Sequence, residues 1–274
     1  MGPVIFDYDK CNNDGICAAV CPRKLIKLDA ESSKPESIPE AAELCINCGH
    51  CLAVCPTSAI ILKGINSEDC PRINKKQLPD YEQVDLLMRS RRSIRVYKDK
   101  PLDQEIIDQL LDTCRYAPSG SNSQPVHWIV ASGRERLNDL AQMVIDWMRQ
   151  EVEAKSPIAE RMHLDVVVEG WERGEDRIFR GGPAVMMTHA PEIGSLPSEN
   201  CVIAMTFLDL AAAVLGLGTC WVGYLMLAAS QHPPIREALG IPQDHRFFGA
   251  MIVGYPKFSY QRIPERNQLN VSWW

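Results

Sequence analysis

Two blocks of cysteines near the N-terminus have a spacing that suits iron–sulfur clusters. The chain has 11 cysteines among 274 residues, and seven of them lie between Cys11 and Cys55. The block Cys45–Cys55 follows the order C-x2-C-x2-C-x3-C, with Pro56 directly after it. In such a run three closely spaced thiolates wrap one cluster, and the fourth points away to a second cluster. The run therefore predicts a site for iron and sulfide, whose chemistry is the transfer of single electrons.

The earlier block, Cys11–Cys21, repeats this pattern with one exchange, because Asp14 stands where the second cysteine is expected. One predicted [4Fe–4S] cluster is held by Cys45, Cys48, Cys51 and Cys21, and the other cluster by Cys11, Cys17 and Cys55 with Asp14 as the candidate fourth ligand. A hard carboxylate is a poor match for a soft thiolate site, so this corner should exchange easily. The second site therefore holds a [4Fe–4S] cluster through Asp14, holds a [3Fe–4S] cluster, or stays empty.

The alternative for the cysteine blocks is a pair of zinc knuckles, since C-x2-C pairs also bind zinc. Zinc does not require this spacing of ligand positions twice, each time with a trailing proline, and iron is therefore favoured. Apolar segments at 4–6, 25–28 and 59–62 predict short strands around the blocks, in a small pseudo-twofold α+β unit. Residues 1–63 thus resemble the two-cluster bacterial ferredoxins.

Composition and charge exclude several classes of partner. The net charge is −6, so neither nucleic acid nor an anionic membrane is expected as a partner. The start, Met1–Lys10, lacks the features of a signal peptide. The most apolar run, Cys201–Leu217, contains Thr206 and Asp209 and is shorter than the roughly 20 residues of a membrane span. Exposed clusters need a reducing compartment, and we expect a cytoplasmic protein.

Residues 64–80 lack periodicity, carry two prolines and predict a linker. From residue 81 onward the pattern is that of a second domain, 81–274, in which helices alternate with strands. Helices are predicted around 84–88 and 106–114 (with Asp103 as N-cap), and over 134–156 and 198–217; strands are predicted at 127–131, 184–188, 220–223 and 247–255. Helices beside a small mixed sheet make the predicted fold class α+β.

Three short stretches of this domain could bind a ligand. Arg91–Arg95 offers three guanidiniums and a hydroxyl, which suit a phosphate, although basic runs are more often solvated surface. Ala117–Pro125 is a turn-forming loop rich in hydrogen-bonding groups, or else an ordinary helix–strand connection. Gly216–Gly223 joins a buried helix to a strand through glycines that permit the close approach of a flat ligand. A simple helix C-cap explains Gly216 and Gly218 but not Gly223.

Taken together and in this order, the three stretches resemble the nitroreductase family of flavoproteins, over residues 81–274. The resemblance implies a central mixed, mainly antiparallel sheet flanked by helices, and FMN at the interface of a homodimer. It implies that Arg91, Arg92 and Ser93 bind the FMN phosphate and that Arg95 lies near the pyrimidine edge of the flavin. It further implies flavin contacts by Trp221, Val222, Gly223 and, from the other subunit, Pro118, Ser119, Gly120 and Asn122, with Arg266 (second choice Arg262) at the phosphate.

The function implied is that of a flavin-dependent oxidoreductase. Electrons from a donor such as ferredoxin would pass through the clusters to FMN and then to a small acceptor: a nitroaromatic, a quinone, an enoate or a flavin. One alternative is an electron-transfer or redox-sensing partner protein with no small substrate of its own, and another is direct use of NAD(P)H. Around Trp221 the sequence lacks the acidic residue that several relatives place beside flavin N5, and the segment 145–182 matches no known pattern.

Overall fold

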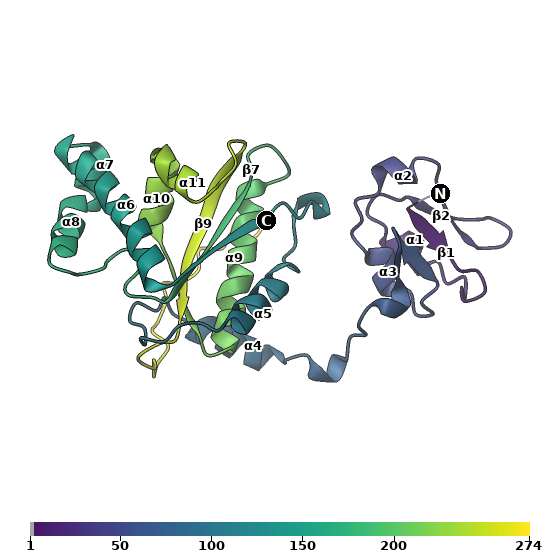
Figure 1. The fold of residues 1–274 in the computed structure, drawn as a ribbon. Coiled ribbons are helices and arrows are strands. Elements are labelled where there is room, and N and C mark those ends of the chain that lie inside the picture. Colours follow the sequence, from purple (N-terminus) through teal and green to yellow (C-terminus); the bar gives the residue numbers. More distant parts are fainter. Residues whose placement is uncertain (1–2) are drawn as a thin grey trace. The chain divides into compact units, whose positions relative to one another are not determined.

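A computed structural model describes residues 3–274, which form two compact units (Figure 1). The first consists of the residues up to Leu78 together with Ser121–Ser123, and the second of Pro79–Gly120 together with Gln124–Trp274. Among the residues described, no helix is both long enough and apolar enough to cross a membrane.

The first unit is built from short strands and one-turn helices. Strand β1 (Val4–Phe6) pairs with β4 (Ile60–Leu62), which pairs with β5 (Ile65–Asn66), while β2 (Ile26–Leu28) pairs with β3 (Pro35–Ser37); all these pairs are antiparallel. The helices are α1 (Ile16–Val20), α2 (Ala41–Leu44) and α3 (His50–Val54). A small core between them contains Val4, Ile26, Leu52, Ile60 and Leu62.

The segment after β4, predicted as a linker, contains ordered turns. Besides β5 it includes the short 3-10 helices η1 (Ser67–Asp69) and η2 (Lys75–Gln77). The Ser67 hydroxyl donates a hydrogen bond to the Ile60 carbonyl at 2.6 Å, which ties η1 to β4. Sequence periodicity misses this segment because its structure depends on pairing with β4 rather than on a repeating apolar pattern.

A four-stranded antiparallel sheet in the order β6-β7-β9-β8 forms the centre of the second unit. Its strands are β6 (His127–Ser132), β7 (Ala184–Pro191), β8 (Gly218–Trp221) and β9 (His245–Gly254). A single parallel bridge, between Ser93 and Thr219, adds the mixed character that the sequence predicts. The α+β class is thereby confirmed.

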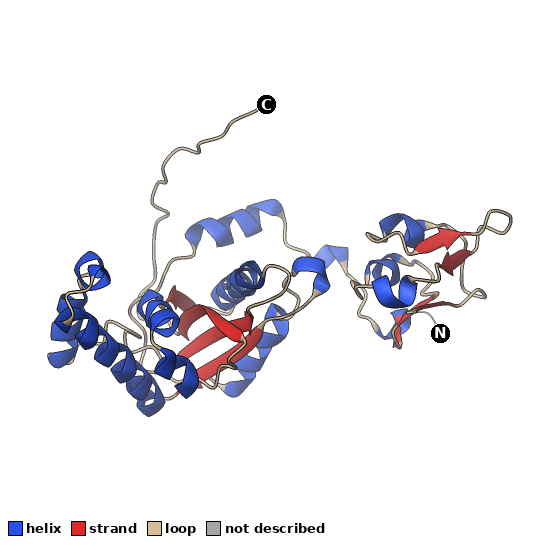
Figure 2. Ribbon diagram, turned by 90° about the horizontal axis from the view of Figure 1, so that it is seen from above, coloured by secondary structure: helices blue, strands red, loops and turns tan. Residues whose placement is uncertain are grey.

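Helices cover both faces of this sheet (Figures 1 and 2). Along β7 the side chains alternate, so that Val185 and Met187 pack in one core and Met186 in the other. On one side lie α5 (Gln104–Cys114) and α9 (Pro197–Val214), and on the other α6 (Arg134–Glu153), α7 (Pro157–Met162), α8 (Leu164–Glu172), α10 (Gly223–Gln231) and α11 (Pro233–Ala238). A further helix, α4 (Tyr81–Ser90), precedes the sheet, and the short 3-10 helix η3 spans Gly120–Asn122.

Two details differ from the prediction, and one segment has a structure that the sequence did not indicate. The strand expected at 220–223 ends at Trp221, because the chain turns at Val222 and α10 begins at Gly223. Asp103 occupies the N-cap position of α5, but its side chain makes no capping hydrogen bond. The unmatched segment 145–182 completes α6 and forms α7 and α8, and Trp147 is buried in the core there.

Candidate functional site

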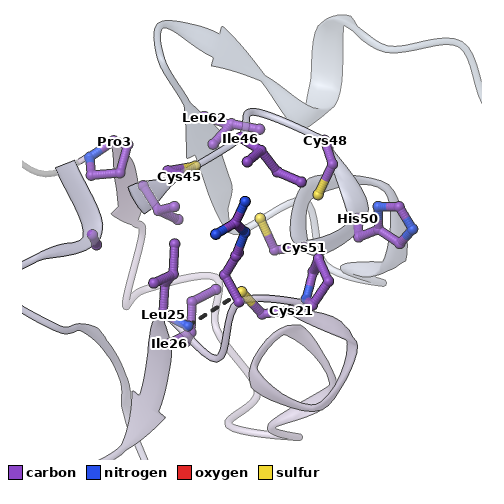
Figure 3. A pocket seen from close by; sticks show the side chains of 15 residues that line it. Pro3, Cys21, Leu25, Ile26, Cys45, Ile46, Cys48, His50, Cys51 and Leu62 are labelled. Atoms are coloured by element: carbon purple, nitrogen blue, oxygen red, sulfur yellow. Dashed lines mark hydrogen bonds between the residues drawn. The ribbon is translucent and has the colours of Figure 1, made fainter. Parts of the chain in front are cut away.

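Four cysteines of the first unit line one cavity, which holds about 420 Å³ of empty space, part of it open to solvent (Figure 3). They are Cys21, Cys45, Cys48 and Cys51, the set that the spacing assigns to one cluster. The Leu25 amide donates a hydrogen bond to Cys21 Sγ at 3.3 Å. Arg23 and His50 also line the cavity. The chain therefore gathers four soft ligands around a hollow suited to a cluster.

A second cavity of about 320 Å³ is lined by Cys11, Cys17 and Cys55, together with Asp14. The Ala59 amide donates to Cys55 Sγ at 3.2 Å, as Leu25 does to Cys21. The Asp14 carboxylate is exposed, and its Oδ1 accepts a hydrogen bond from the Ile16 amide at 3.1 Å. Asp14 therefore has a local role at the start of α1 that its position in the motif did not reveal.

Burial favours the protonated form of one thiol in each cavity. Burial raises the pKa of Cys51 to about 11 and also raises the pKa of Cys17. Since iron binds the thiolate, loading either cavity must release protons. Within residues 3–274, no three histidine, cysteine or acidic side chains converge closely enough to hold a single metal ion.

In the second unit, Arg91 lies beside a half-buried carboxylate. Its Nη1 is 2.7 Å from Asp209 Oδ2, and the Thr219 hydroxyl donates to the other oxygen of Asp209. The Ile94 amide donates to the Thr219 carbonyl at 2.8 Å, and Ser93 bridges to Thr219. The start of the basic run is thus attached to β8 and α9. The sequence motifs do not assign Asp209 a function, although it is the single charge of the apolar run Cys201–Leu217 and could be singled out on that ground.

The loop between α5 and β6 uses several of its polar groups internally. The Gly120 amide donates to Asn200 Oδ1 at 3.0 Å, and the Asn200 side chain donates in turn to the Ser195 carbonyl at 2.6 Å. The Ser119 hydroxyl accepts from the Gln124 amide at 2.9 Å. Pro118 is exposed, and Asn122 lies in the segment grouped with the first unit. Two of the groups predicted to contact flavin are therefore already engaged in this single chain.

The third stretch ends at the N-terminus of a helix. The Val222 amide pairs with the Ala250 carbonyl at 2.9 Å, which leaves it unavailable to a ligand. Gly223 is exposed and is the first residue of α10, where backbone N–H groups have no partner within the helix. Trp221 is 38% exposed. The Gly223 amide is therefore the backbone donor that this stretch can offer to an electron-rich atom.

Other predicted residues are not brought together in one chain. Arg92 is half-buried and Arg95 is exposed. Arg262 and Arg266 are exposed in the extended segment that follows β9, which runs away from the sheet in Figure 2. A single chain therefore does not place Arg266 beside Arg91.

The fold also brings together three histidines that sequence spacing left apart. His189 Nδ1 and His245 Nδ1 are 2.8 Å apart, and the His127 ring stacks on that of His189 with centroids 5.2 Å apart. Burial, followed by the nearby His245 and His127, lowers the pKa of His189 to about 4. The three residues lie on three different strands, so only the register of the sheet could have revealed the cluster.

Comparisons with known proteins agree on both parts of the chain. Residues 88–255 match the model of the nitroreductase family, and residues 9–59 match that of the 4Fe–4S dicluster domain. A putative NADH dehydrogenase/NAD(P)H nitroreductase of Archaeoglobus fulgidus is 28% identical over 172 residues, covering 61% of this chain and 82% of the relative. A protein of the same description from Methanothermobacter thermautotrophicus is 29% identical over 175 residues, covering 62% and 75%.

The fold is also found in solved structures. A crystal structure of a nitroreductase with bound FMN from Bacteroides fragilis matches with a TM-score of 0.56 at 22% identity, covering 69% of this chain and 98% of that one. At this identity the match concerns the fold alone. The nitroreductase model, by contrast, spans more than half of the sequence. The chain therefore belongs to the nitroreductase family of oxidoreductases and carries a 4Fe–4S dicluster domain ahead of its family domain.

Proposed function

We propose that this chain is an FMN-dependent oxidoreductase that receives electrons singly through iron–sulfur clusters and delivers them to a small organic acceptor. The observation that carries the proposal is the pair of cysteine-lined cavities on the same chain as a nitroreductase domain. FMN, when bound, supplies a group that takes up electrons one at a time and gives them up in pairs. The chain would then convert single-electron input into two-electron output.

The residues of the second unit fit a flavin nucleotide. Arg91 is fixed by Asp209 through one N–H and keeps further N–H groups of its guanidinium for a phosphate. Ser93 adds a hydroxyl, and the exposed Gly223 contributes its amide at the N-terminus of α10. Arg95, which is exposed and charged, would stabilise negative charge on the reduced ring system. These groups hold and orient the cofactor, and Arg92 contributes a second charge at the phosphate.

A homodimer would supply the remaining contacts, through Pro118, Ser119, Gly120 and Asn122 of the other subunit and through Arg266 in the tail. Uncovered apolar side chains support this arrangement. On α4, Met88 is 54% exposed, and at the end of α9 Val214 is 70% exposed. Near the C-terminus Trp273 and Trp274 are exposed as well. In the proposed homodimer these side chains would lie at the interface.

The acceptor we propose is a nitroaromatic, a quinone, an enoate or free flavin, and the donor a small redox protein such as ferredoxin in the cytoplasm. The names of the curated relatives support a nitro compound as one acceptor and NAD(P)H as a second source of electrons. In the competing function, the chain would carry electrons to a protein partner without turning over a small substrate.

Anaerobic reconstitution followed by a turnover assay tests this function. The loaded protein should contain both FMN and iron and should be brown-yellow. Reduced protein should be reoxidised rapidly by at least one member of a panel of nitroaromatics, quinones, enoates and flavins. Failure with every acceptor, in protein that holds its cofactors, would favour the electron carrier. A colourless preparation after reconstitution would contradict both functions.

A further inference from the structure

Helix α9 carries a half-buried carboxylate, Asp209, to which the proposed function assigns no role. Asp209 is the only charged residue between Cys201 and Leu217, and its side chain is 13% exposed. Burying a carboxylate is costly unless it is paired and hydrogen-bonded. The partners of Asp209 therefore explain why a charge occupies this position in the apolar part of α9.

Both oxygens of Asp209 are used, and by two different segments. Oδ2 pairs with Arg91 Nη1 at 2.7 Å, and the Thr219 hydroxyl donates to Oδ1. Arg91 follows α4, whereas Thr219 lies on β8. Asp209 therefore joins three elements at the point where the basic run begins.

The backbone reinforces this junction. Thr219 accepts a hydrogen bond from the Ile94 amide at 2.8 Å, and Gly218 leaves the space that the Ile94 side chain occupies, since a Cβ there would lie 2.2 Å from Ile94 Cγ1. The chain from residue 91 to residue 94 is thus held at both ends, by Asp209 and by β8. Because a guanidinium is planar and rigid, fixing one of its nitrogens sets the direction of the others.

We propose that Asp209 is a positioning residue, which orients Arg91 to bind the phosphate of a flavin nucleotide. The inference rests on the proposed function, since it requires that a flavin nucleotide binds beside Arg91. It also predicts whether FMN binding becomes weaker or tighter when the carboxylate is removed. A carboxylate that merely happened to lie near a phosphate would repel it, and its removal would tighten binding. A carboxylate that orients the phosphate ligand would weaken binding when it is removed.

The test compares FMN with riboflavin, which lacks the phosphate. Full-length protein with its iron–sulfur module loaded and its flavin removed is titrated with each compound, and binding is followed by quenching of flavin fluorescence. The variant Asp209→Asn keeps the size of the side chain and removes its charge. We expect it to weaken FMN binding about tenfold, as the loss of one charge-assisted hydrogen bond implies, with riboflavin binding unchanged. The matched control is Asp85→Asn, which removes an exposed ion pair with Arg89 on α4 and should change neither affinity.

Two further variants keep the test decisive. Thr219→Val removes one hydrogen bond to Asp209, retains the charge, and should give a smaller loss of the same kind even if Asp209→Asn fails to fold. Arg91→Gln should lower FMN affinity relative to riboflavin, and adding Asp209→Asn to it should cause no further loss. Tighter FMN binding by Asp209→Asn, or equal weakening of both flavins, would overturn the positioning role. If Arg91→Gln leaves the ratio of the two affinities unchanged, the assignment of Arg91 to the phosphate fails instead.

Discussion

The two cysteine-lined cavities of the first unit share a backbone and differ in one ligand. Asn13 and Asn47 both have positive φ, and Gly15 and Gly49 have φ values of 70° and 76° before equivalent five-residue helices. Cys48 in the first cavity corresponds to Asp14 in the second. The turn that wraps a cluster therefore does not depend on the thiolate at its second position. Any difference in metal retention between the cavities should come from that one side chain.

Removing the second-position ligand from each cavity should produce the largest difference between the two cavities. Cys48→Ala should abolish the cluster of the four-cysteine cavity and remove about half of the bound iron, since each cavity is proposed to hold one cluster. Asp14→Ala should remove little, because a carboxylate holds iron weakly in a thiolate site. Assays of iron and acid-labile sulfide on the reconstituted variants measure both losses. Equal losses from the two variants would show that Asp14 binds as firmly as Cys48.

Placing a cysteine at position 14 tests whether this one side chain accounts for the difference between the cavities. Asp14→Cys should make the second cavity retain four irons and resist loss of iron to a chelator. EPR should then show the spectrum of two [4Fe–4S] clusters, with no signal from a three-iron form. Asn12→Cys, two residues earlier in the same turn, is the control and should not have this effect. If the wild-type protein and Asp14→Cys release iron at the same rate, the prediction that iron exchanges easily at Asp14 is wrong.

Release of iron by acid would also compare the two cavities. Such an experiment must allow for the second unit, in which the buried pair His189 and His245 makes folding sensitive to acid. His189 has a folded pKa of about 4, below its ordinary 6.5, so folding favours the neutral form. Its contribution to stability is present above pH 6.5 and is lost as the pH falls toward 4, by up to about 3 kcal/mol. Thermal unfolding of the wild-type protein should show this loss. In His189→Asn the loss should be absent, and in the exposed control His163→Gln it should persist.

The smallest expected effect concerns the turns themselves. Gly15→Ala and Gly49→Ala each force alanine into left-handed backbone, at about 1 kcal/mol. At Gly15 the new Cβ would also lie 2.8 Å from Leu28 Cδ1, whereas at Gly49 nothing lies within 4 Å. Chemical denaturation of reconstituted protein should therefore rank Gly15→Ala below Gly49→Ala in stability. The reverse order would show that the contact with Leu28 does not determine the difference between the two variants.

Local patterns were sufficient to predict the cysteine-lined part of the first unit, but not the turns after β4, and only part of the second unit. The cysteine spacing predicted which side chains share a cavity. The first three ligand positions of each block are placed by the turn that they form, and the fourth cysteine of each block points to the other cavity. Helices and strands with a clear apolar period, such as α6 and β7, were also predictable. The start of α10 at Gly223 was not, since an apolar run fits a buried strand and a buried helix equally well. The His189–His245 pair and the contact between Arg91 and Asp209 join residues far apart in sequence, and only tertiary packing brings them together.

The most direct test of the account is the rate at which bound FMN is reduced by a one-electron protein donor. Stopped-flow absorbance under anaerobic conditions, with reduced ferredoxin as the donor, would compare the wild-type chain with a variant in which Cys45, Cys48 and Cys51 are all replaced by alanine. If electrons reach the flavin through iron–sulfur clusters, its reduction should be fast in the wild-type chain and should slow by orders of magnitude in the variant, with FMN still bound. Equal rates in the two proteins would contradict the account.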